Sequence, residues 1–228
     1  MVRAEHLRQH YESANPVMRG WLHLVAAPLA GVATVLLAFL APSHLRVAAV
    51  LFAVTTVLLF ATSAVYHRGR FSPRVTGILQ RWDHANIFLV IAGSATPFAV
   101  AMLEPGPARN LLAVLWLGAA GGALTRLVWV RAPKWLFLPM YLALGWASAV
   151  YLPAFLRSDA LPDTRHAWVV ALIVLGGLLY TMGAGVFATR WPDPSPRLFG
   201  FHEVFHSFTL GGWISHYLAA ALVVTAVR

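Results

Sequence analysis

Seven long apolar stretches dominate this chain of 228 residues, and they constrain its fold more than any other feature. A helix needs about 20 consecutive apolar residues to cross the hydrocarbon core of a bilayer. Charged residues make up 11% of the chain, which is less than half of the roughly 25% found in an average soluble domain. We therefore expect an all-α protein, a seven-transmembrane-helix bundle, rather than a soluble or disordered chain.

The limits of the spans follow from hydropathy and from turn residues. Spans are expected at about residues 19–40, 45–67, 83–103, 110–130, 135–156, 166–188 and 200–227. Prolines separate several of them, as in residues 104–107 and 191–196, because proline lacks an N–H donor and fixes φ. Residues 1–18 are expected to form a cytoplasmic N-terminal segment without a cleaved signal peptide, and residues 19–228 a single seven-helix membrane domain.

The distribution of basic residues predicts the orientation of this bundle. With seven spans, 12 of the 17 Lys and Arg residues fall on the side of the N-terminus and the other 5 on the opposite side. The positive-inside rule then places the N-terminus in the cytoplasm and the C-terminus outside. We expect a multi-pass protein of the cell membrane whose partner is membrane lipid. The net charge of +9 comes with no nucleic-acid-binding motif, so binding of nucleic acid is not expected.

Four ionisable side chains are predicted to lie at one level near the cytoplasmic face. His67 ends the second span, Asp83 begins the third, and His202 and His206 open the seventh. Ionisable groups within a membrane are costly and mark functional sites by default. His202 and His206 are four residues apart and share one helix face, which is how a helix presents two metal ligands. Ser63 and His67 repeat this spacing on the second span.

The residue types at this level suit a catalytic metal. The chain has no cysteine, which excludes disulfides and thiolate sites, whereas catalytic zinc sites often use histidine and carboxylate and leave one position for water. The three histidines could fill three zinc positions, and Asp83 could bind zinc directly or hold and deprotonate the water. A zinc-bound water ionises near neutral pH, as hydrolysis of an amide or ester requires. Other divalent ions also accept these ligands.

Five further polar residues have local interpretations. His23 lies one turn inside the first span, and we consider it as a group beside the site or in contact with a substrate. His84 points about 100° away from Asp83 around the helix, so it is expected to lie away from the site. His216 is expected to form a buried hydrogen bond between helices. Glu203 is expected to stabilise a helix N-terminus or to accept a hydrogen bond near the site, and Arg126 to extend to the cytoplasmic interface.

Three motifs in these spans resemble those of the hemolysin III family. They are SAVYH at residues 63–67, WDHANIF at 82–88 with AGSATP at 92–97, and FGFHEVFH at 199–206 followed by SHY at 215–217. They occur in the order and on the spans that the family shows. The hemolysin III family is related to the progestin and adipoQ receptor family and, distantly, to the alkaline ceramidases.

The resemblance implies a seven-helix membrane protein with zinc near the cytoplasmic face. It implies that His67, His202 and His206 are the zinc ligands and that Asp83 and Ser63 are polar partners of the zinc-bound water. One departure is visible. Related members often carry Gly-Thr-Tyr-Thr-Pro where residues 93–97 here read Gly-Ser-Ala-Thr-Pro. The tyrosine hydroxyl is absent, so any substrate contact that it would make is not expected here.

The leading hypothesis is a zinc-dependent hydrolase of a lipid amide, ceramide-like or otherwise. Asp83 would act as general base, and Ser63 would bind the developing oxyanion or the water. One alternative is a non-enzymatic regulator or sensor of membrane lipid state, in which zinc is structural. Another is a membrane-lytic, haemolytic protein, although the spans carry no continuous polar stripe. Neither the substrate nor the oligomeric state follows from the sequence.

Overall fold

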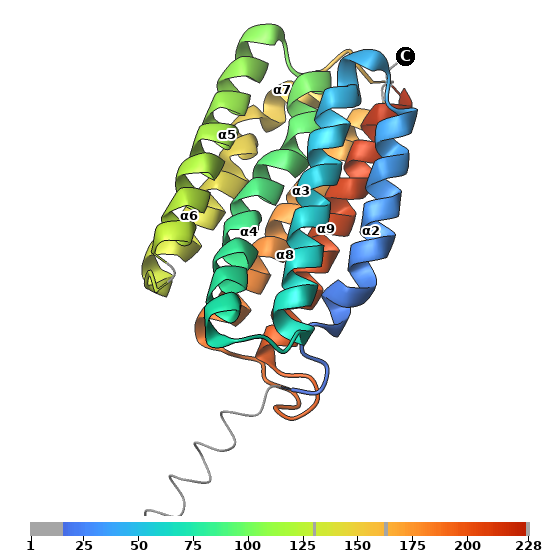
Figure 1. The fold of residues 1–228 in the computed structure, drawn as a ribbon. Coiled ribbons are helices and arrows are strands. Elements are labelled where there is room, and N and C mark those ends of the chain that lie inside the picture. Colours follow the sequence, from blue (N-terminus) through green and yellow to red (C-terminus); the bar gives the residue numbers. More distant parts are fainter. Residues whose placement is uncertain (1–15, 130, 162–163, 227–228) are drawn as a thin grey trace, which may run out of the picture.

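The fold is a bundle of seven helical spans. A computed structural model describes residues 16–129, 131–161 and 164–226, and seven helices in these residues are long and apolar enough to cross a membrane. The elements are α2 (Trp21–Leu40), α3 (Ser43–Arg68), α4 (Pro73–Met102), α5 (Pro105–Val128), α6 (Lys134–Gly145), the 3₁₀ helix η1 (Trp146–Tyr151), α7 (Leu152–Leu156), α8 (Arg165–Thr189) and α9 (Phe201–Ala226). Figure 1 shows α2 beginning and α9 ending at opposite ends of the bundle. The predicted seven-helix architecture is confirmed.

Prolines account for three differences from the predicted spans. α4 begins at Pro73 and α5 at Pro105, because a proline in the first turn gives up an N–H that would have no partner there. Asp83 consequently lies inside α4 rather than at its start. The fifth span is not one helix but α6, η1 and α7 in succession. Pro153, at the start of α7, cannot continue a regular helix because its ring clashes with the carbonyl four residues earlier.

α4 is the central helix of the bundle. Inside its membrane window, 72% of the residues are buried, against 22–56% in the other six spans. Polar contacts fix it against α3, since Asn86 Nδ2 donates to Leu58 O at 2.9 Å and to Thr62 Oγ1 at 3.1 Å. A side chain in place of Gly93 would overlap Thr55, so the two helices approach closely here. The residues on α4 are therefore held in a fixed register against α3.

The outer surface of the bundle is apolar. Large hydrophobic side chains lie on it with most of their area exposed, among them Phe39 (78%), Trp135 (76%) and Val150 (79%). Such a surface is typical of contact with lipid rather than water. Together with the seven spans, it identifies a multi-pass membrane protein.

Parts of the predicted topology lie outside the described residues. These are residues 1–15, which include Arg3 and Arg8, and residues 227–228, which include Arg228. The cytoplasmic position of the N-terminus and the division into residues 1–18 and 19–228 remain predictions. Among the described residues, Val17 N and Met18 N donate to the carbonyls of Arg197 and Leu198. The chain before α2 is thus attached to the loop that precedes α9.

Candidate functional site

Three histidine side chains converge at the end of the bundle where α2 begins. His67 lies in the last turn of α3, and His202 and His206 lie in the first two turns of α9. One ring nitrogen from each lies within 4.8 Å of the others, and Nε2 of His67 is 3.3 Å from Nε2 of His202. Nitrogens bound to one tetrahedral zinc at 2.0–2.1 Å are about 3.4 Å apart. The nitrogens of His67 and His202 have this spacing, and no pair exceeds it by more than about 1.4 Å. This donor set therefore fits a zinc ion after a small adjustment.

Two acidic side chains hold the first turn of α9. Glu203 Oε2 accepts a hydrogen bond from Gly200 N at 2.9 Å, and Asp193 Oδ1 accepts one from Phe201 N at 2.8 Å. Glu203 Oε1 also pairs with Arg19 Nε at 2.7 Å. These contacts satisfy N–H groups that the start of a helix leaves without partners. The predicted role of Glu203 at a helix N-terminus is confirmed, and this turn presents both α9 histidines to α3.

Asp83 and Ser63 lie beside the histidines. Asp83 Oδ2 is 3.9 Å from His67 Nε2, and the Asp83 residue is only 8% exposed. Ser63, one turn before His67 on α3, is buried and lies beside the Asp83 carboxyl group. The structure therefore brings the five predicted site residues to one end of the bundle. We call these residues the histidine cluster: Ser63, His67, Asp83, His202 and His206.

His23 of α2 completes the surroundings of this cluster. Its ring stacks on that of His206, with centroids 3.9 Å apart and an interplanar angle of 8°. Its Nδ1 is 2.8 Å from Ser63 Oγ, while its buried Nε2 has no hydrogen-bond partner among the described residues. In the sequence, His23 lies one turn inside its span, and this position made it a candidate site residue. In the structure it contacts two residues of the cluster, His206 and Ser63.

Arg126 forms a buried network that the sequence did not reveal. It is 2% exposed, and its Nη2 donates to Nδ1 of His84 at 2.8 Å. Its guanidinium carbon lies 4.3 Å from the centre of the Phe137 ring. The prediction that Arg126 extends to the interface is wrong, because neighbouring helices enclose its charge. Since a guanidinium only donates, Nδ1 of His84 is the acceptor and the neutral ring carries its proton on Nε2.

The network also changes the interpretation of His84. Tyr141 of α6 donates its hydroxyl hydrogen to the backbone carbonyl of His84 at 2.9 Å, and both residues line a cavity that Asp83 also lines. The prediction that His84 lies away from the site is wrong, because His84 lines the same cavity as Asp83. No local sequence pattern indicates this contact, because Arg126 and His84 are 42 residues apart in the chain and meet only when α4 and α5 pack.

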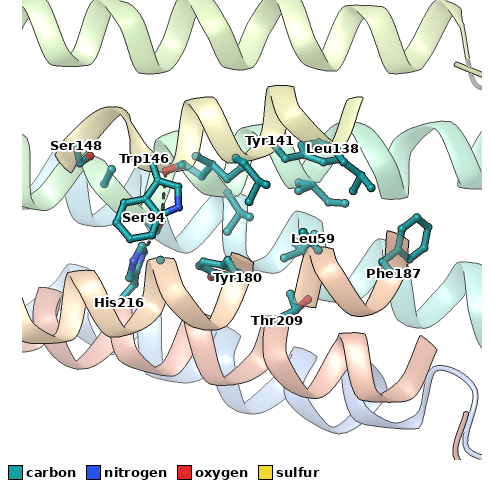
Figure 2. A pocket seen from close by; sticks show the side chains of 18 of the residues that line it. Leu59, Ser94, Leu138, Tyr141, Trp146, Ser148, Tyr180, Phe187, Thr209 and His216 are labelled. Carbon is teal, nitrogen blue, oxygen red and sulfur yellow. Dashed lines mark hydrogen bonds between the residues drawn. The ribbon is translucent and has the colours of Figure 1, made fainter. Parts of the chain in front are cut away.

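A cavity of about 130 Å³ extends from the histidine cluster into the bundle. Asp83, His202 and His206 line one end, and its walls are mostly apolar side chains. Figure 2 shows Ser94, Ser148 and His216 at the end away from Phe187. His216 Nδ1 lies 3.1 Å from Ser94 Oγ, so the predicted hydrogen bond between helices is confirmed and joins α9 to α4.

Comparison with known proteins agrees with this architecture. Residues 11–217 match the family described as "Haemolysin-III related". The chain is 30% identical to "Hemolysin-3" of Bacillus cereus over 205 residues, which cover 88% of this chain and 86% of that protein. It is 28% identical to the "Hemolysin-3 homolog" of Bacillus subtilis (strain 168) over 162 residues, 71% of this chain and 70% of that one.

More distant similarity extends to eukaryotes. The human "Monocyte to macrophage differentiation factor" is 26% identical over 166 residues, which cover 71% of this chain and 63% of the human protein. The family match spans most of the chain, including the helices that carry the histidine cluster, and a relative at 30% identity is aligned along nearly its full length. This chain therefore belongs to the haemolysin-III-related family of membrane proteins.

Proposed function

We propose that this protein is a zinc-dependent hydrolase that cleaves a lipid amide at the histidine cluster. His67, His202 and His206 would hold the ion. The observation that carries the proposal is the convergence of three imidazole nitrogens and one buried carboxyl group at the end of an apolar cavity. Bound zinc would polarise the amide carbonyl and lower the pKa of an attacking water.

The protein groups around the cluster supply the proton transfers. Asp83 accepts a proton from the attacking water through its carboxylate and returns it to the nitrogen of the departing amine. The C–N bond of the amide breaks, and a carboxylic acid and an amine leave. Ser63 donates a hydrogen bond to the oxygen on which negative charge develops. His23 holds this hydroxyl in place, because Nδ1 of its ring is 2.8 Å from Ser63 Oγ.

The cavity supports a lipid as the substrate. Its walls include Leu59, Val90 and Phe98, which favour a hydrocarbon chain and exclude water from the path behind the cluster. A substrate taken from the bilayer would place its amide at the polar end and its chain between the helices. We further propose, from the basic residues, that this end of the bundle faces the cytoplasm.

Purified protein in lipid nanodiscs tests the proposal. We expect about one zinc ion per chain, cleavage of at least one member of a panel of lipid amides that includes ceramide, loss of cleavage with a chelator and recovery when zinc is restored. Protein that is loaded with zinc and cleaves no amide or ester in a broad panel would exclude the hydrolase. Zinc would then be assigned to holding α3 against α9.

A further inference from the structure

The cavity beside the histidine cluster has polar groups at both ends, and most of the side chains between them are apolar. Ser94, Ser148 and His216 line its far end (Figure 2). His206 at the near end and His216 are ten residues apart on α9, and a helix rises 1.5 Å per residue, so the two ends are about 15 Å apart. A ligand that fills the cavity therefore meets polar groups at two separate positions.

The far end offers hydrogen-bonding groups that the protein does not use itself. Tyr180 and Ser148 line the cavity, and their hydroxyl groups make no hydrogen bond with the described residues. His216 Nδ1 is occupied by Ser94 Oγ. Its Nε2 is buried against Gly176 and the backbone of α8 near Ile173, so it is not open to the cavity. A purely apolar ligand would leave the hydroxyl groups of Tyr180 and Ser148 without partners, which is unfavourable in a membrane interior.

Glycines make room for the two rings at this end. A side chain at Gly176 of α8 would overlap the imidazole of His216, and one at Gly212 of α9 would come within 2.9 Å of the ring of Tyr180. The two rings meet edge to face, with centroids 5.6 Å apart. Glycine is less favourable than alanine inside a helix. Gly176 and Gly212 therefore have a packing role, because they leave the space that the two rings occupy.

A hydrogen bond between helices accounts for only part of this arrangement. Ser94 and His216 are sufficient to join α4 to α9. Tyr180 comes from α8 and Ser148 from η1, and neither contributes to that bond. Their presence at the same end of the cavity needs a different explanation, and a polar group on a ligand provides one.

We propose that the far end binds a hydroxyl or carbonyl group on the hydrocarbon part of a lipid, about 15 Å from the group held at the histidine cluster. Tyr180 contacts this oxygen, and the His216 ring, which Ser94 holds in place, packs against the Tyr180 ring. The ligand class is a fatty acyl lipid with a hydroxyl or oxo group near the far end of its chain. This ligand class narrows the substrate of the proposed hydrolase. The inference rests on the proposed function only in taking the ligand to be a lipid, because the test measures binding without turnover.

Binding of matched fatty acids to the full chain in nanodiscs tests the proposal. The probes are ω-hydroxydodecanoate, unsubstituted dodecanoate, and β-hydroxydodecanoate, whose hydroxyl lies next to the carboxylate. We expect the ω-hydroxy acid to bind about tenfold more tightly than the other two, as one buried hydrogen bond allows. Tyr180→Phe, which removes one oxygen, should abolish most of this preference. Tyr217→Phe is the matched control, because Tyr217 lines a separate groove on α2 and α9.

The ratio of affinities distinguishes a ligand site from helix packing. Equal affinities for the three acids, no binding of any of them, or a preference that survives both Tyr180→Phe and Ser94→Ala would overturn the proposal. Hydrolysis of an unsubstituted lipid amide is followed in the same preparations. If the preference is found and no amide is cleaved, the hydrolase proposal fails while the binding site stands.

Discussion

The two ends of the cavity contain similar side chains in different arrangements. At the near end, imidazoles from α2, α3 and α9 gather around one point, two of their nitrogens lie 3.3 Å apart, and a carboxyl group is 3.9 Å from one of them. At the far end, one imidazole is held by one serine, and the cavity-lining residues there include no acid. Burial of a histidine is therefore not by itself a sign of chemistry. Convergence of several ligand atoms with a carboxylate is the distinguishing feature.

The largest effect should come from removing one of the converging nitrogens. His206→Ala should reduce bound zinc from about one ion per chain to almost none, because two imidazoles hold the metal far less tightly than three. Metal content by mass spectrometry and the midpoint of thermal unfolding are the measurements. His44→Ala, at an exposed position near the start of α3, should change neither. If the His206→Ala protein still binds about one zinc ion per chain, His206 is not a zinc ligand and the contrast between the two ends does not hold.

A smaller loss is expected when the carboxylate is replaced while the nitrogens stay. Asp83→Asn should remain folded and loaded with zinc, and its rate of amide cleavage should fall about 10²- to 10⁴-fold, the usual contribution of a general base. Asp159→Asn, on an exposed loop, serves as the control in a steady-state assay. A structural metal predicts no change of phenotype for Asp83→Asn. Loss of zinc from this variant would instead make Asp83 a direct ligand.

The Ser63→Ala variant tests the role of the polar groups beside the three histidines. It removes the hydroxyl between Asp83 and His23, and we expect a reduction of about 10- to 100-fold in zinc affinity or turnover. Competition with a zinc chelator and single-turnover kinetics separate the two quantities. Ser207→Ala is the matched control, since that serine is exposed and bonds to the Glu203 carbonyl within its own helix. Identical behaviour of the two variants would show that the hydroxyl at residue 63 has no special role.

The smallest effect is expected at the far end. Ser94→Ala removes one hydrogen bond between α4 and α9, and such bonds in membrane proteins contribute about 0.6 kcal/mol on average. Unfolding in mixed micelles should show a decrease of that size, with bound zinc and cleavage of an unsubstituted amide unchanged. A large loss of zinc in this variant would mean that the two ends are coupled through α4 or α9, and the comparison would no longer hold.

The histidine cluster was predictable because its signals are local in the sequence. The spacing of His202 and His206 places them on one helix face, and His67 stands out at the end of a long apolar run. The positions of basic residues place the ends of three spans on one side, which brings these residues to a common level. Helix periodicity and topology are sufficient for this part of the site.

The far end and the Arg126 network depend on packing that no local pattern reveals. Ser148 enters the cavity wall from η1, where the fifth span departs from a regular helix, and Tyr180 depends on the glycine that faces it on α9. The start of α4 was placed too late because Arg74 and Arg81 lower the hydropathy of its first turns. Hydropathy detects the part of a helix that lies in lipid, and the rest of α4 extends past it.

The buried guanidinium of Arg126 has a consequence for the biogenesis of the protein. An arginine that enters the bilayer on an isolated helix costs about 2.5–3.5 kcal/mol when it lies at the centre of the span and less toward its ends. In the folded protein His84 of α4 and Phe137 of α6 surround this charge. The charge on the fourth span is therefore compensated only when its neighbours pack against it. We expect α4, α5 and α6 to leave the translocon together, as a cooperative insertion unit, rather than one helix at a time.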